Sequence, residues 1–126
     1  MKRLLLLCSI SLALLSACGG FPPPTERLNT AEGAIRGAQE VGAQAKARAA
    51  LHLKLAQEQT DEARQLMQDG YNERADFALR RAQADAELAI AIVKEEETKQ
   101  SAEEVTAKLE KARSEAMQTP TAKRKR

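Results

Sequence analysis

Side chains that commonly carry enzyme or metal chemistry are scarce in this chain of 126 residues. It has one histidine, two cysteines, no tryptophan, and only three tyrosine and phenylalanine residues together. A lone histidine has no partner for a catalytic triad, and the Cys/His clusters that hold zinc are missing. His52 lies between Leu51 and Leu53, so we expect it at the surface or at a helix seam. We therefore expect no enzyme activity, no bound metal and no cofactor.

Strand signals are also nearly missing, and helix formers replace them. Ala, Gln, Glu, Lys, Arg and Leu dominate, with 22 alanines after residue 17. These residues have the best intrinsic helix propensities. The composition predicts an all-α fold.

One long apolar run is present, at the N-terminus. Lys2 and Arg3 precede an apolar run of about a dozen residues, and small residues follow at Ser16 and Ala17. This order is typical of a secretory signal, and the run is too short for a membrane-spanning helix, which needs roughly 20 apolar residues. We expect residues 1–17 to be a signal peptide.

The residue after the expected cleavage site makes the signal specific. Leu15-Ser16-Ala17-Cys18 resembles the lipobox of bacterial lipoproteins, which implies lipidation of Cys18 with acyl chains such as palmitate. Two or more chains hold a protein stably on a membrane. Gly19 stands where Asp would, in enteric bacteria, signal retention in the inner membrane. The resemblance implies a lipid anchor in the outer membrane of a Gram-negative bacterium, facing the periplasm.

Processing changes the charge and the thiol content. Removal of Lys2 and Arg3 reduces the 20 basic residues to 18, equal to the number of acidic ones, so charge gives no argument for nucleic acid. Cys8 leaves with the signal and Cys18 is taken by lipid. A disulfide is therefore excluded in the mature chain.

The mature chain divides into three parts. Residues 18–28 combine the lipidated cysteine with a tether of two glycines and three prolines, which favour a flexible or extended chain. Residues 29–117 form an Ala-rich helical domain. Residues 118–126 form a basic tail that we expect to be disordered, because it has no apolar periodicity.

Two rows of small side chains at steps of three or four predict the helices. Asn29 with Glu32 fits the start of the first helix, Gly42 predicts a bend in it, and Asp69-Gly70 predicts a turn near residues 69–71. The first row comprises Ala31, Ala34, Ala38, Val41, Ala45, Ala49, Leu53, Ala56, Thr60, Ala63 and Met67. The second comprises Ala75, Ala78, Ala82, Ala86, Ala89 and Val93.

The pattern changes beyond Val93. Three glutamates interrupt it, and a row of Ala102, Val105, Leu109, Ala112 and Ala116 then resumes half a turn out of phase. Residues 101–104 fit a capping box, which favours a break or kink there, and a continuous helix is the close alternative. Glutamates and lysines four apart predict ordinary helix ion pairs on a solvated face rather than a cation site.

Pairing of the two rows about Gly70 predicts an antiparallel hairpin with an alanine seam. The expected partners are Ala63 with Phe77, Ala56 with Ala84, Ala49 with Ala91, and Ile35 with Val105. Alanines bury little apolar surface, so a lone hairpin should be marginal. We expect a long helical hairpin or a three-helix bundle, completed by a third helix, by self-association or by a partner.

The chain ends with a run of four cations. Lys123, Arg124, Lys125 and Arg126 are candidates for contact with anionic lipid head groups or an anionic cell-wall polymer. A solubilising tail with no partner is the alternative, because short charge runs are commonly solvated ends.

The region from Leu28 to Val93 resembles an uncharacterised family of bacterial envelope proteins, domain-of-unknown-function family 4398. The resemblance rests on Gly70 and Tyr71 together with Ala31, Ala34, Ala38, Leu53, Ala56, Ala63, Ala75, Ala82, Ala86 and Ala89. That family implies no activity for this chain. A second resemblance is to the murein lipoprotein, a lipidated Ala-zippered helix with basic residues at its end.

These observations favour a non-enzymatic envelope lipoprotein with a structural or adaptor role, presenting a helical surface in the periplasm. Its partners would be the membrane, through the lipid, and peptidoglycan or another envelope protein. A periplasmic binding or chaperone-like module, and a cell-wall-associated protein of the murein-lipoprotein type, are the alternatives.

Overall fold

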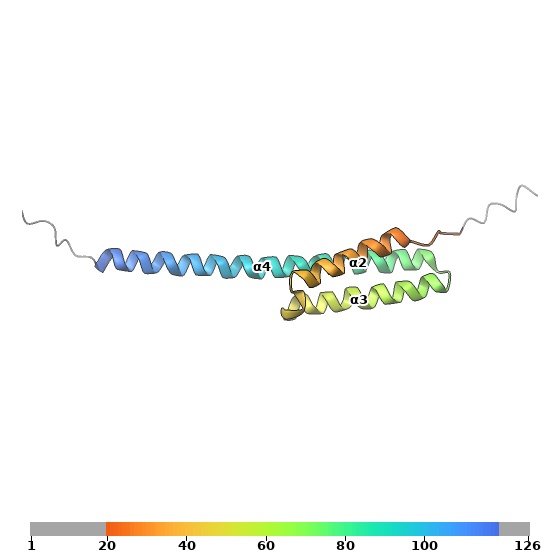
Figure 1. Ribbon diagram of the computed structural model, residues 1–126, viewed down its shortest axis with the longest axis horizontal. Coiled ribbons are helices and arrows are strands. Elements are labelled where there is room, and N and C mark those ends of the chain that lie inside the picture. The colour runs from red at the N-terminus through yellow and green to blue at the C-terminus, as the bar shows by residue number, and fades with distance from the viewer. Residues whose placement is uncertain (1–19, 119–126) are drawn as a thin grey trace, which may run out of the picture.

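The computed structural model describes residues 20–118, and they form helices without any strand (Figure 1). Helix α2 spans Thr25–Glu40, the 3-10 helix η2 spans Ala43–Ala45, α3 spans Ala47–Gln68, and α4 spans Asn72–Gln118. Helices α2 and α4 run in the same direction, and α3 runs opposite to both. The all-α expectation is confirmed, in its three-helix form.

Helix α2 begins at Thr25, four residues before the start expected at Asn29. Pro24 precedes it, and its carbonyl accepts a hydrogen bond from the Leu28 amide at 3.0 Å. Proline suits this position because its fixed φ is compatible with a first helical turn and it has no amide to leave unpaired. The Thr30 hydroxyl donates a hydrogen bond to the Glu26 carbonyl inside the helix at 3.0 Å.

Gly42 reverses the chain rather than bending one long helix. Its φ is +77°, in the left-handed region that glycine enters without steric cost. The turn lays α2 alongside the first half of α4. The predicted pairing of Ile35 with Val105 is therefore wrong: Ile35 is buried in a cluster with Ala89 and Ile92, and Val105 is exposed.

The turn expected at Asp69-Gly70 joins α3 to α4. Gly70 has a φ of +81°, its amide bonds to the Met67 carbonyl, and the Tyr71 amide bonds to the Leu66 carbonyl at 2.8 Å. This bond pair is a Schellman motif, which satisfies the last carbonyls of a helix. The turn therefore fixes Tyr71 relative to the end of α3.

The α3–α4 pairing follows the predicted antiparallel register, whereas some predicted partners face solvent. His52 lies opposite Asp85, and Arg48 lies opposite Glu95. Phe77, Ala84 and Ala91 are exposed, because the second helix is rotated so that other positions form the seam. The buried alanines of that seam are Ala49, Ala56, Ala63, Ala75, Ala78, Ala82, Ala86 and Ala89.

Helix α4 is continuous through residue 101, so the favoured break there is wrong. The hydroxyls of Thr98 and Thr106 bond to the carbonyls of Lys94 and Ala102 within the helix, at 2.7 and 2.8 Å. The phase shift that suggested a break marks instead the place where α4 leaves the bundle (Figure 1). Every residue from 97 to 118 is exposed. We call residues 97–118 the arm.

Candidate interaction surface

The site residues predicted from the sequence lie outside the described part of the chain. These are the lipidation site and the basic cluster, namely Cys18, Lys123, Arg124, Lys125 and Arg126. The structure does place their neighbours in the chain. Gly20 precedes α2 at one end of the molecule, and Gln118 ends α4 at the other (Figure 1).

No other described helix packs on the arm, and all of its residues are exposed. At about 1.5 Å per residue, its 22 residues extend roughly 33 Å from the bundle. Val105 is 55% exposed and Leu109 is 66% exposed. They share one face with Ala102, Ala112 and Ala116, because the steps between these positions are three or four. The arm thus presents a narrow apolar stripe to solvent.

Ion pairs flank this stripe at the spacings that the sequence predicts. Lys99 bonds to Glu95, and Lys108 lies against Glu104, each at 2.6 Å. The hydrogen bond from Lys99 and its charge lower the pKa of the exposed Glu95 carboxyl. Such pairs each stabilise an isolated helix by about 0.2–0.5 kcal/mol, so they contribute to the helicity of the arm.

A buried carboxylate ties α2 to α4. Asp76 is 6% exposed, and it accepts hydrogen bonds from Arg27 of α2 and from Arg80 one turn along α4, the second at 2.8 Å. Burial raises the pKa of this carboxyl, but the bonds and charges of the two arginines outweigh burial and lower it below 3.8. The contact between Asp76 and Arg27 was not predicted, because it depends on how two helices are rotated against each other.

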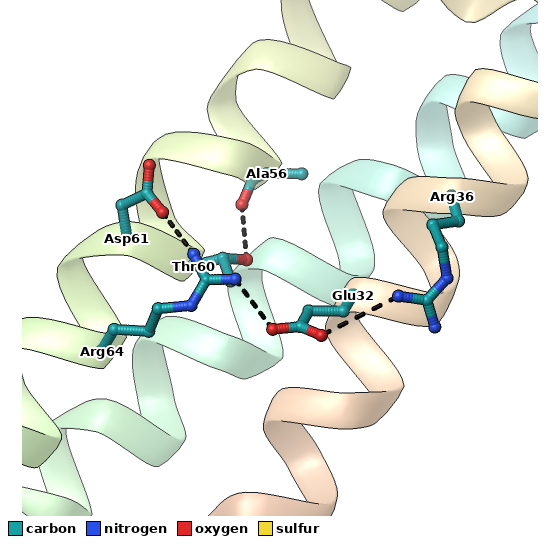
Figure 2. A network of polar contacts seen from close by, with 6 residues as sticks. All are labelled: Glu32, Arg36, Ala56, Thr60, Asp61 and Arg64. Carbon is teal, nitrogen blue, oxygen red and sulfur yellow. Dashed lines mark hydrogen bonds and ion pairs between the residues drawn. The ribbon is translucent and has the colours of Figure 1, made fainter.

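A second polar cluster joins α2 to α3 (Figure 2). The Arg64 guanidinium donates to Glu32 at 2.8 Å and to Asp61 at 2.5 Å, and Glu32 also faces Arg36 at 3.8 Å. The hydrogen bond to Glu32 is the main cause of a raised pKa at Arg64. The Glu32–Arg36 and Asp61–Arg64 pairs have helical spacings of four and three within one helix, whereas the contact between Glu32 and Arg64 joins two helices and could not be predicted.

His52 lies at the α3–α4 seam. Its Nδ1 is 2.8 Å from Asp85 Oδ1, and the Gln59 amide donates to the other oxygen of the same carboxylate, also at 2.8 Å. Each of these side chains has its partner on the facing helix. The geometry therefore gives His52 a role in joining helices.

The part of the chain described here, residues 20–118, has no group of three or more His, Cys, Asp or Glu side chains placed to hold a metal ion. Within the same range, no helix is both long enough and apolar enough to cross a membrane.

The comparison with protein families adds one identification. The family model described as Domain of unknown function (DUF4398) matches residues 26–105, which include the bundle except the first residue of α2, and the beginning of the arm. No curated protein and no solved structure matches the chain. Since the match covers more than half of the sequence, the chain belongs to the DUF4398 family.

Proposed function

We propose that this protein is a non-enzymatic lipoprotein of the bacterial envelope, anchored in the outer membrane through Cys18, and that its arm and basic tail contact the cell wall. The bundle acts as a base that holds α4. The arm carries the contact surface away from that base.

The exposure of the arm is the observation that carries the proposal. The 22 residues of the arm are exposed and add nothing to the core that the described residues form, so packing within residues 20–118 does not explain why α4 extends beyond the bundle. An apolar stripe of modest width on such a helix fits contact with another surface. Four cations begin five residues after the end of the arm, at Lys123, and suit an anionic polymer.

The lipid anchor is supported by the order of residues at the N-terminus. A short cationic segment, an apolar run and small residues directly before Cys18 agree with a lipoprotein signal. Because no described helix can cross a bilayer, a lipid on Cys18 would supply the attachment.

The test is sedimentation of the mature protein with purified peptidoglycan sacculi. We expect the full chain to sediment with sacculi, and deletion of residues 123–126 to weaken this binding and its dependence on salt. A control replaces four exposed bundle cations, Arg48, Lys54, Arg80 and Arg81, with Gln, which removes as many charges as the deletion without touching the arm. Equal binding by the full chain and the tail deletion would rule out a wall-binding role for the tail.

A chaperone-like module is the second candidate, and the exposed Val105 and Leu109 side chains favour it. Such a protein would suppress the aggregation of unrelated unfolded proteins. A wall-binding adaptor would leave that aggregation unchanged while still sedimenting with sacculi. Light scattering of a thermally unfolding client protein separates the two functions.

A further inference from the structure

The few aromatic side chains of this protein are all exposed, and two of them lie at the same end. Phe21, Tyr71 and Phe77 are 47, 55 and 58% exposed. Phe21 and Tyr71 line one surface hollow of about 290 Å³ at the α3–α4 turn, together with Gly70, Asn72, Glu73 and Arg74. We call Phe21, Tyr71 and Arg74 the aromatic end. Single exposed apolar residues are common on proteins, but a pair on one tip is a feature to explain.

The aromatic end is held in place by specific bonds. The Asn72 side-chain amide donates to the Phe21 carbonyl at 2.9 Å, which fastens the segment before α2 to the beginning of α4. The Thr25 amide bonds to the Pro23 carbonyl at 2.9 Å. Prolines restrict the backbone between Phe21 and the helix. The expected tether is thus docked on the bundle over residues 21–24.

The position of this end relative to the proposed anchor follows from chain length. Phe21 is three residues after Cys18, and successive Cα atoms are about 3.8 Å apart, so the two Cα atoms are separated by at most about 11 Å. The head-group region on each side of a bilayer is itself roughly 5–8 Å thick. A lipidated Cys18 therefore keeps Phe21 within reach of the membrane interface.

The chemistry of the aromatic end suits that interface. Aromatic side chains that carry a polar group are favoured where apolar and aqueous phases meet. Tyr71 combines an apolar ring with a polar hydroxyl. The Arg74 guanidinium lies over the Tyr71 ring, 5.5 Å from its centre, where it can also meet a lipid phosphate. The exposed acids Glu26, Asp69 and Glu73 are nearby in the chain, so attraction to anionic lipid is not the driving force.

We infer that the aromatic end is a membrane-docking site, which seats in the bilayer interface beside the lipid anchor and sets α4 pointing away from the membrane. The inference rests on the proposed lipidation of Cys18. Helix α4 begins at the aromatic end and is about 70 Å long for its 47 residues. The eight residues after Gln118 can extend about 28 Å at most, so they cannot return to the same bilayer. Docking would thus direct the basic tail to the wall.

Single tryptophans test this inference, because the natural chain has none. The lipidated full-length mature protein is reconstituted in phosphatidylcholine vesicles containing brominated lipid, as three variants: Tyr71→Trp, Phe77→Trp and Leu109→Trp. The last is the matched control, since Leu109 is an exposed apolar residue on the arm, about 57 Å along α4 from residue 71. Circular dichroism checks that each variant remains helical. A fourth variant combines Tyr71→Trp with Phe21→Ser.

We expect strong quenching and a blue shift at position 71, weaker quenching at 77, and none at 109. The added Phe21→Ser change should reduce quenching at 71 while the protein stays on the vesicles. Equal quenching at 71 and 109, or none at 71 on vesicle-bound protein, would overturn the docking inference and leave the proposed anchor standing. Protein that carries no lipid and stays off the vesicles would overturn the proposed function, and the docking with it.

Discussion

The Asp76 carboxylate is a buried charge that is bonded to side chains of two helices. It is buried at the α2–α4 contact, and its two oxygens accept from arginines on two helices. A buried carboxylate is stable only when such partners are present. The contact of Asp76 with Arg27 therefore fixes the position of α2 against α4, in a bundle whose alanines bury little apolar surface.

Replacement of Asp76 by Asn should weaken the bundle. It removes the charge but keeps the shape, and hydrogen bonds to charged groups contribute about 1.5–3 kcal/mol. We expect a loss at the lower end of that range, because Arg27 and Arg80 are partly exposed. Thermal unfolding followed by circular dichroism measures it. Glu104→Gln on the arm is the control. An equal melting temperature for D76N and E104Q would contradict the stabilising role of Asp76.

The pKa of Asp76 predicts how this loss depends on pH. The pKa is lowered in the folded state from its ordinary 3.8, so ionised Asp76 stabilises the fold fully above that value. The contribution is lost as pH falls through the folded pKa, because the carboxyl is then protonated in both states. The free energies of unfolding of the wild type and D76N, measured in urea, should differ at pH 7 and become equal below the folded pKa of Asp76. A difference that persists undiminished in strong acid would contradict this account.

At the scale of helices, substitutions at two glycines test the turn between α2 and α3: Gly42 lies in the turn, and Gly33 lies inside α2. Gly42 has a positive φ, where a side chain costs about 1–2 kcal/mol. Gly33 lies inside α2, and an added Cβ would meet nothing nearer than the tip of Arg36 at 3.9 Å. Alanine is better than glycine in a helix interior by roughly 0.5–1 kcal/mol.

Gly42→Ala should therefore lower the melting temperature, and Gly33→Ala should raise it. Both substitutions add one methyl group, so each serves as the control for the other. Chemical denaturation gives the free energies of unfolding. If Gly42→Ala were neutral or stabilising, the left-handed turn would not be a requirement of the fold.

The two alanine rows predicted the faces that α2, α3 and the first half of α4 bury, except at Val41 and Ala45, which lie by the turn and are exposed. The reversal at Gly42 was harder, because Gly33 and Gly37 offered the same local weakness within α2. The contacts of Asp76 with Arg27 and of His52 with Asp85 could not be predicted, since they depend on the rotation of packed helices. The continuity of α4 past residue 101 was missed because a local capping pattern was weighed above strong helix propensity.

At the scale of the whole molecule, the bundle and the arm should be separable. A chain that ends at Gln100 keeps the ion pairs of Lys46 and Arg48 with α4, and the described residues that it loses, 101–118, are all exposed. We expect its free energy of unfolding to stay within about 0.5 kcal/mol of the full chain, as for surface changes in general. Urea unfolding checks this, and a large loss would show that the arm packs on the bundle.

The chain that ends at Gln100 should also lose binding to the cell wall. The shortened chain lacks both the apolar stripe at Val105 and Leu109 and the tail, so it should fail to sediment with sacculi while it remains folded. Retained binding would place the contact surface on the bundle instead.

The central claim is that a lipid on Cys18 makes this helical rod an envelope protein. Intact-mass spectrometry of the protein extracted from membranes of a Gram-negative host tests it most directly. The account predicts a chain that begins at Cys18 and carries the added mass of diacylglycerol and acyl groups, and the Cys18→Ser variant should leave the membrane fraction. An unmodified thiol at Cys18, or a retained residue 1–17 segment, would contradict it.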